Sequence, residues 1–147
     1  MNLFELNWQL IWFHSYHLLA AFTLALPLGW DREQSNRSFG LRTFPLVAVV
    51  TCGFMMLGIS VIDSTGGEAR IFQGIITGIG FIGGGSILTS SDKVKGTATA
   101  ATIWNTGAIG VAVAFDRFEI AAILSALNFF TLLVFKEIKE TVKDKND

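Results

Sequence analysis

Five long stretches without Asp, Glu, Lys or Arg constrain the fold of this chain more than any other feature of its sequence. They cover residues 9–30, 44–62, 71–88, 98–115 and 120–135. A helix needs about 20 mostly apolar residues to cross a hydrocarbon core of about 30 Å, and its backbone groups must bond within the helix because lipid offers them no partner. The sequence therefore predicts an all-α integral membrane protein, a bundle of five transmembrane helices.

The composition is consistent with one membrane domain and argues against several functional classes. Only 16% of the 147 residues are charged, whereas soluble domains carry about 25%. A net charge of −1 suggests no nucleic-acid surface, and the single cysteine, Cys52, allows no internal disulfide. The sequence has no phosphate-binding loop, nucleophile elbow or metalloprotease helix. We therefore expect a protein that is not an enzyme and that holds neither a cofactor nor a metal ion.

The basic residues predict the orientation of the bundle. Nine of the eleven Lys and Arg residues lie in alternate segments, namely those after the first and third predicted spans and the tail 136–147. Segments rich in Lys and Arg stay in the cytoplasm, so we expect the N-terminus outside and the C-terminus, with its short tail, inside. The first residues lack the basic segment of a cleavable signal peptide, so we interpret 9–30 as a retained span.

The third stretch is unusual because it holds six glycines between Gly74 and Gly85. The Gly74-xxx-Gly78 and Gly80-xxx-Gly84 spacings are typical of helices that approach a neighbour closely in lipid. A second interpretation is a distorted helix at Gly83–Gly85, where freed carbonyls would line a polar cavity, as in some transporters. Glycine costs about 1 kcal/mol relative to alanine in a helix, so either packing or function must offset that cost.

The fourth stretch is only weakly apolar because threonines, alanines and glycines interrupt it. Asn105 falls near its middle, and an amide at that depth must find a partner, usually across a helix interface. Asn105 therefore either forms a hydrogen bond between helices or belongs to a functional site. Trp104 beside it either faces lipid or caps the bundle.

Charged and titratable residues near the predicted membrane edges are further candidates. Glu33 and Arg42 lie in the first inner segment, where Arg42 either anchors the interface or pairs with Glu33 at the mouth of the bundle. Arg70 lies on the predicted outer side, against the positive-inside bias. His14 and His17 lack further ligands nearby, so we interpret them as packing or interface residues rather than a metal site.

Three motifs, in this order, resemble the signatures of the MgtC/SapB family. The first is Glu33 followed by Gly40-Leu-Arg-Thr43, and the second is Arg70 followed by Gly78-Ile-Gly-Phe-Ile-Gly-Gly-Gly85. The third is Val94-Lys-Gly-Thr-Ala-Thr-Ala-Ala101 followed by Trp104. The resemblance covers roughly residues 28–121, and it identifies these matching positions as site candidates: Glu33, Arg42, Thr43, Arg70, Gly78, Gly80, Gly83, Gly85, Thr99 and Trp104, to which the residue reasoning adds Asn105.

The chain also departs from the family pattern. It has Thr97-Ala98 and Gly84 where the family usually has Leu-Thr and Ala, and it has Cys52-Gly53 where Gly-Ala is usual. Well-known members carry a cytoplasmic domain after the fifth span, whereas this chain resembles a short form in which only the tail 136–147 follows.

The resemblance implies a multi-pass protein of the bacterial inner membrane, linked to adaptation to low magnesium. Family members resemble one another in regulating other membrane machines. Our leading hypothesis is a regulatory protein whose partners are the lipid bilayer and another membrane protein, with the F-type ATP synthase or a magnesium transporter as candidates and a homo-oligomer as a further option. The alternative is a small-ion (magnesium) transporter or channel acting as an oligomer. Nucleic acid is not an expected partner.

Overall fold

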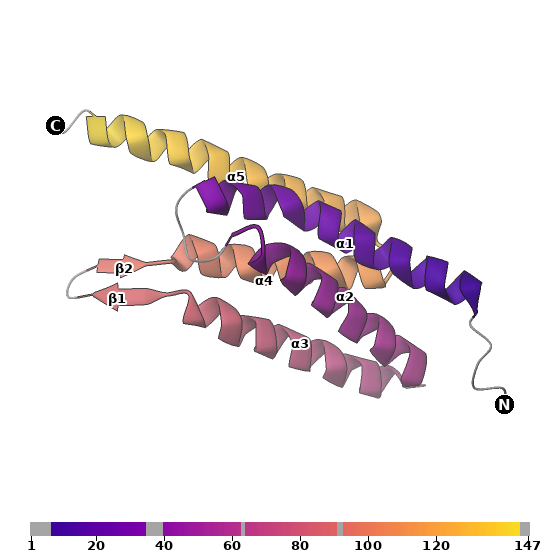
Figure 1. Ribbon diagram of the computed structural model, residues 1–147. Helices are drawn as coiled ribbons and strands as arrows, with labels where there is room; N and C mark the ends of the chain where they lie inside the picture. Colours follow the sequence, from indigo (N-terminus) through magenta and orange to yellow (C-terminus); the bar gives the residue numbers. More distant parts are fainter. Residues whose placement is uncertain (1–6, 35–39, 63, 91–92, 145–147) are drawn as a thin grey trace.

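A computed structural model describes residues 7–34, 40–62, 64–90 and 93–144 of the chain, and in this part it contains five helices and one short hairpin (Figure 1). The helices are α1 (Trp8–Gln34), α2 (Thr43–Val61), α3 (Thr65–Gly85), α4 (Thr97–Ala114) and α5 (Phe118–Asp144). The strands β1 (Leu88–Ser90) and β2 (Lys93–Lys95) pair antiparallel between α3 and α4, with Thr89 opposite Val94. The chain is thus all-helical apart from this hairpin, as predicted.

The helices follow the predicted stretches but not at every boundary. α1 extends past residue 30 to Gln34, and α5 continues through the predicted tail to Asp144. The predicted third span is wrong at both ends, because α3 begins at Thr65 and ends at Gly85, and Leu88 belongs to a strand. The Ser64 hydroxyl starts α3 early by accepting a hydrogen bond from the Gly67 N–H at 3.2 Å.

Among the described helices, three are long and apolar enough to cross a membrane: α1, α2 and the Phe118–Phe135 part of α5. α3 and α4 are not among these three: α3 combines glycines with Glu68 and Arg70, and α4 carries threonines and Asn105. The described part of the chain is therefore helical and contains spans of membrane type.

The helices run alternately in opposite directions (Figure 1). One end of the bundle holds the α1–α2 connection and the hairpin, and the other end holds the α2–α3 and α4–α5 turns. α4 contacts all four other helices, whereas α3 packs mainly against α2 and α4 at the edge. The core is built largely from small and β-branched residues, including Ala21, Ala25, Ala48, Cys52, Ile109, Val113 and Ala121.

Small residues let α4 occupy this central place. A Cβ atom on Gly110 would overlap the Ala48 carbonyl oxygen of α2, and one on Gly107 would overlap the end of the Ile79 side chain in α3. Close approach of this kind is how helices associate in lipid, where hydrophobic burial supplies little drive. The Ile79 side chain can move aside but the α2 backbone cannot, so the position of α4 depends mainly on the absence of a side chain at Gly110.

We predict that Gly110→Ala lowers the free energy of unfolding by about 1–3 kcal/mol, because the new methyl group must displace the backbone of α2. The matched control is Gly80→Ala, where the methyl group meets open space and helix propensity gains up to about 1 kcal/mol. Thermal unfolding of purified protein in detergent measures both. Equal stability of the two variants would contradict the close contact between α2 and α4.

Candidate functional site

Glu33 and Gly40, both in the first motif, form one local structure at the α1–α2 connection. The Glu33 carboxylate accepts a hydrogen bond from the Leu41 N–H at 3.1 Å. A Cβ atom on Gly40 would overlap that carboxylate, and one on Gly29 would lie 3.1 Å from the Leu41 Cα. The chain thus returns close against the last turns of α1, and Glu33 holds it there.

Of the two alternatives for Arg42, the ion pair with Glu33 is not formed among the described residues, where the Glu33 carboxylate accepts from the Leu41 N–H. Arg42 is exposed and occupies the position before α2, whose end it does not cap with its side chain. Thr43 is half-buried, and its N–H donates to the Gly40 carbonyl at 3.0 Å. The motif therefore positions the chain between α1 and α2, and the Arg42 guanidinium remains accessible.

The second and third motifs meet where the hairpin joins α3 to α4. Ser86, which is buried, donates its hydroxyl to the Gly83 carbonyl at 2.7 Å and lies 3.5 Å from the Gly96 carbonyl. Gly96 has a φ of 91°, and a Cβ atom there would overlap the Ser86 carbonyl, so glycine is required on both counts. A Cβ atom on Gly83 would lie 3.2 Å from the Ala100 carbonyl of α4.

The glycines 83–85 do not interrupt a span, so that prediction is wrong. They form the end of α3, where the Ser86 and Ile87 N–H groups donate to the Gly83 and Gly84 carbonyls at 3.0 Å each. These two carbonyls are therefore used to terminate the helix in the ordinary way. The cavity lined by freed carbonyls is not formed there.

The prediction of tight packing for the six glycines between Gly74 and Gly85 holds within this chain only for Gly83. Within the described part of the chain, a Cβ atom on any of the other five would meet nothing within 4 Å: Gly74, Gly78, Gly80, Gly84 and Gly85. Gly74, Gly78 and Gly85 lie on one side of α3 and form an open glycine face, whereas Gly80 and Gly84 lie on another side, and glycine at all five positions costs helix stability.

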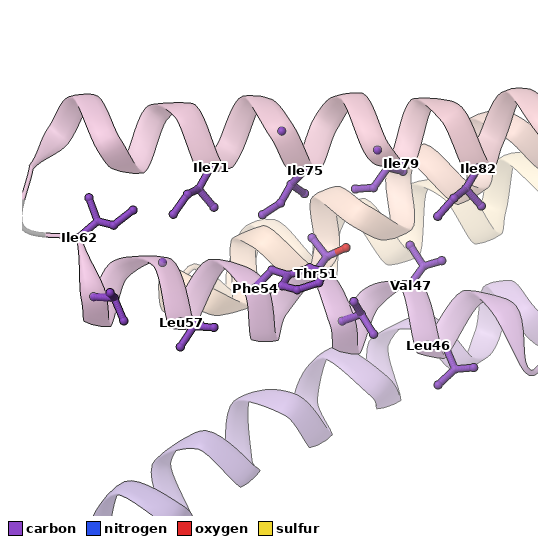
Figure 2. Close-up of a pocket in the computed structure, with 15 residues that line it drawn as sticks. Leu46, Val47, Thr51, Phe54, Leu57, Ile62, Ile71, Ile75, Ile79 and Ile82 are labelled. Atoms are coloured by element: carbon purple, nitrogen blue, oxygen red, sulfur yellow. The ribbon is translucent and has the colours of Figure 1, made fainter.

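Part of this open face borders an apolar groove of about 750 Å³ between α2 and α3 (Figure 2). From α3 the groove is lined by Ile71, Gly74, Ile75, Gly78, Ile79 and Ile82. From α2 it is lined by side chains that include Leu46, Phe54, Leu57 and one polar residue, Thr51. On the α3 side, four isoleucine side chains project toward α2, and Gly74 and Gly78 leave two positions without a side chain (Figure 2).

The remaining candidates of α4 face different directions. Thr99 is only 2% exposed, and its hydroxyl has no hydrogen-bond partner among the described residues. Asn105 donates to the Leu124 carbonyl of α5 at 3.3 Å, which is an interhelical bond. Trp104 is exposed and faces away from the bundle. Among the described residues, no group of three or more His, Cys, Asp or Glu is placed to hold a metal ion.

The similarity of the chain to known proteins supports its assignment. A profile of the MgtC family matches residues 18–141. The chain belongs to the MgtC family. It is 33% identical over 138 residues to SrpB of Synechococcus elongatus, a match that covers 85% of this chain and 76% of SrpB. It is 31% identical over 126 residues to YhiD of Escherichia coli K12, covering 81% of this chain and 59% of YhiD.

The chain is also 32% identical over 126 residues to MgtC of Salmonella typhimurium LT2, covering 86% of this chain and 54% of MgtC. It therefore spans only about half the length of MgtC. No solved structure matches the chain. As an MgtC-family protein, it brings most of its motif residues to the end of the bundle that holds the hairpin, whereas Arg70 is exposed in α3 near the opposite end.

Two charged residues of this MgtC-family site were missed by sequence reasoning. Asp31 and Arg32, in the last turn of α1, are only 5% and 6% exposed, and the Arg32 Nε lies 3.4 Å from the Asp31 carboxylate. Buried charges are costly unless they have partners, which makes these residues part of the architecture of this end. The sequence indicates their importance only through their place directly before the motif residue Glu33.

A second missed feature lies at the opposite end. His17 is buried, its Nε2 lies 2.8 Å from the Asp116 carboxylate, and its Nδ1 lies 2.8 Å from the Phe13 carbonyl. A carbonyl only accepts, so Nδ1 donates to Phe13, and Nε2 forms the hydrogen bond to the Asp116 carboxylate. The rings of Phe13, Tyr16 and Phe118 surround the imidazole at centroid distances of 4.2, 5.5 and 5.4 Å. His17 thus fastens α1 to the α4–α5 turn, and the interpretation as a packing histidine was incomplete.

We predict that Asp116→Ala lowers the free energy of unfolding by about 1–3 kcal/mol, because Nε2 of the buried His17 loses its partner. Asp116→Asn should cost less, since an amide still bonds to the ring and Asn tolerates the φ of 59° at this position. Thermal unfolding in detergent measures the difference. His14→Ala, at an exposed position, is the control, and equal losses in the Ala and Asn variants would contradict the bond.

Proposed function

We propose that this chain is a regulatory membrane protein, not an enzyme, that receives a transmembrane helix of another membrane protein in the groove between α2 and α3. The observation that supports this proposal is the open glycine face of α3, where Gly74 and Gly78 line the groove and have nothing packed on them. In lipid, such small residues let a second helix approach closely enough for dispersion contacts to hold it. Binding of a partner helix would thus explain why α3 keeps open glycines that lower its helix stability.

The walls of the groove suit an apolar helix as occupant. Phe54, Leu57 and Val61 of α2 are 59%, 60% and 73% exposed, so apolar side chains that could contact an occupant stand opposite the isoleucines and glycines of α3. None of the fifteen lining residues is charged. A partner helix therefore needs apolar side chains directed at Gly74 and Gly78 and no charge along that face.

The connection of this chain to magnesium rests on its relatives. YhiD is named as a candidate magnesium transporter, and Salmonella MgtC gives the family its name. We propose a role in adaptation to low magnesium, exerted on a partner such as a magnesium transporter or the F-type ATP synthase. A second copy of this chain is the competing occupant of the groove.

We predict that Gly78→Leu abolishes crosslinking to the partner in native membranes, because the new side chain fills the groove. Gly80→Leu should leave crosslinking unchanged. Gly80 is equally open and lies in the same helix, but it does not line the groove. Site-specific photo-crosslinking from Leu57, followed by mass spectrometry of the adducts, identifies the occupant and measures its loss.

Equal crosslinking by both variants would count against the groove as the binding surface. Adducts made only of this chain would replace a foreign partner with a homo-oligomer. Magnesium flux into proteoliposomes that contain only this protein, lost in Glu33→Gln, would overturn regulation in favour of the transporter hypothesis.

We further propose that all five helices cross the bacterial inner membrane, with the N-terminus outside and the C-terminus in the cytoplasm. The alternating directions of the helices and the basic bias of one end support this arrangement. A green fluorescent protein fused after Asp147 should fluoresce, whereas alkaline phosphatase fused there should be inactive. Active phosphatase at that position would mean that the C-terminus lies outside, which contradicts the proposed topology.

A further inference from the structure

A second groove, of about 590 Å³, lies at the end of the bundle opposite the hairpin. α4 forms its floor through Ala108, Val111 and Ala112, while α3 lines one side and the α4–α5 turn with α5 lines the other. Its surface is apolar except for two residues, Glu68 and Arg117. These two stand on different elements, because Glu68 belongs to the first turn of α3 and Arg117 to the α4–α5 turn.

The two charges are not used to hold the fold together. In the part of the chain that the structure describes, neither the Glu68 carboxylate nor the Arg117 guanidinium forms an ion pair or a side-chain hydrogen bond. Glu68 is half-buried and Arg117 is exposed. An anionic and a cationic group therefore line one groove without neutralising each other.

This groove is charged at one end and apolar along the rest, a pattern that is complementary to an amphiphilic ligand. The charged residues lie near the helix ends, at the start of α3 and just before α5, whereas Phe72, Ala108 and Leu124 continue the apolar surface away from these ends. The groove between α2 and α3 has no charged lining residue, so the two grooves call for different occupants. A purely apolar helix would leave Glu68 and Arg117 unsatisfied.

We propose that this second groove binds a zwitterionic phospholipid. The phosphate of the headgroup bonds to the Arg117 guanidinium, the headgroup ammonium pairs with the Glu68 carboxylate, and one acyl chain lies along the apolar floor. Arginine binds phosphate strongly because its planar fork matches the phosphate oxygens. The site goes beyond the proposed regulatory function, because it uses neither the α2–α3 groove nor its glycines.

The test is lipid titration of the purified full chain in detergent, followed by native mass spectrometry. Phosphatidylethanolamine and phosphatidylglycerol with the same acyl chains are the two probes, since only the first carries an ammonium group. Wild type should bind phosphatidylethanolamine about fivefold more tightly, the size of one accessible ion pair. Glu68→Gln should remove this preference, and Arg117→Gln should weaken binding of both lipids about fivefold.

Two further variants make the result specific to the groove. Glu119→Gln, an exposed carboxylate at the same end that does not line the groove, should bind both lipids as wild type does. Ala69→Leu, which narrows the groove, should weaken both lipids and keep the preference, and it tests the site even if a charge variant misfolds. Equal binding of the two lipids by wild type, or equal effects of Glu68→Gln and Glu119→Gln, would overturn the proposal.

Discussion

The close contact between α4 and α2, where Gly110 lies against the Ala48 carbonyl, is the constraint on which the rest of this bundle depends. Because α4 touches all four other helices, its distance from α2 sets where α1, α3 and α5 can lie. In lipid, hydrophobic burial does not draw helices together, so close packing and polar bonds must do so. Asn105 to the Leu124 carbonyl at 3.3 Å and Ser125 to the Leu24 carbonyl at 2.6 Å supply such bonds around the same centre.

The number and approximate place of the helices could be predicted because an uncharged stretch of this length has few other uses. Their ends could not be predicted equally well. The hairpin was missed because Leu88–Ser90 and Lys93–Lys95 are three residues each, too short for any alternation to stand out. The glycines of α3 suggested a close neighbour, but spacing alone does not say whether that neighbour belongs to the same chain, and here it does so only at Gly83.

The candidate site was predicted as a set of residues rather than as an arrangement. The motifs pointed to Glu33, Gly83 and Thr99, yet nothing in the sequence shows that Glu33 binds the Leu41 N–H or that Ser86 joins Gly83 to Gly96. The bond between His17 and Asp116 joins residues 99 positions apart, and the two histidines of α1 offer no clue in the sequence to such a partner. Local patterns thus identified the participants, and only the packing of α1 and α4 brought them together.

The central place of α4 also bears on how the protein is made. Among the described helices, α4 is not one of the three that are long and apolar enough to cross a membrane, and its residues Thr99, Thr102 and Thr106 are buried in the bundle. In the five-span arrangement proposed here, α1 and α2 are synthesised before it and α5 after it. The order of synthesis therefore makes α1 and α2, two of the four helices that α4 contacts, available before α4 itself.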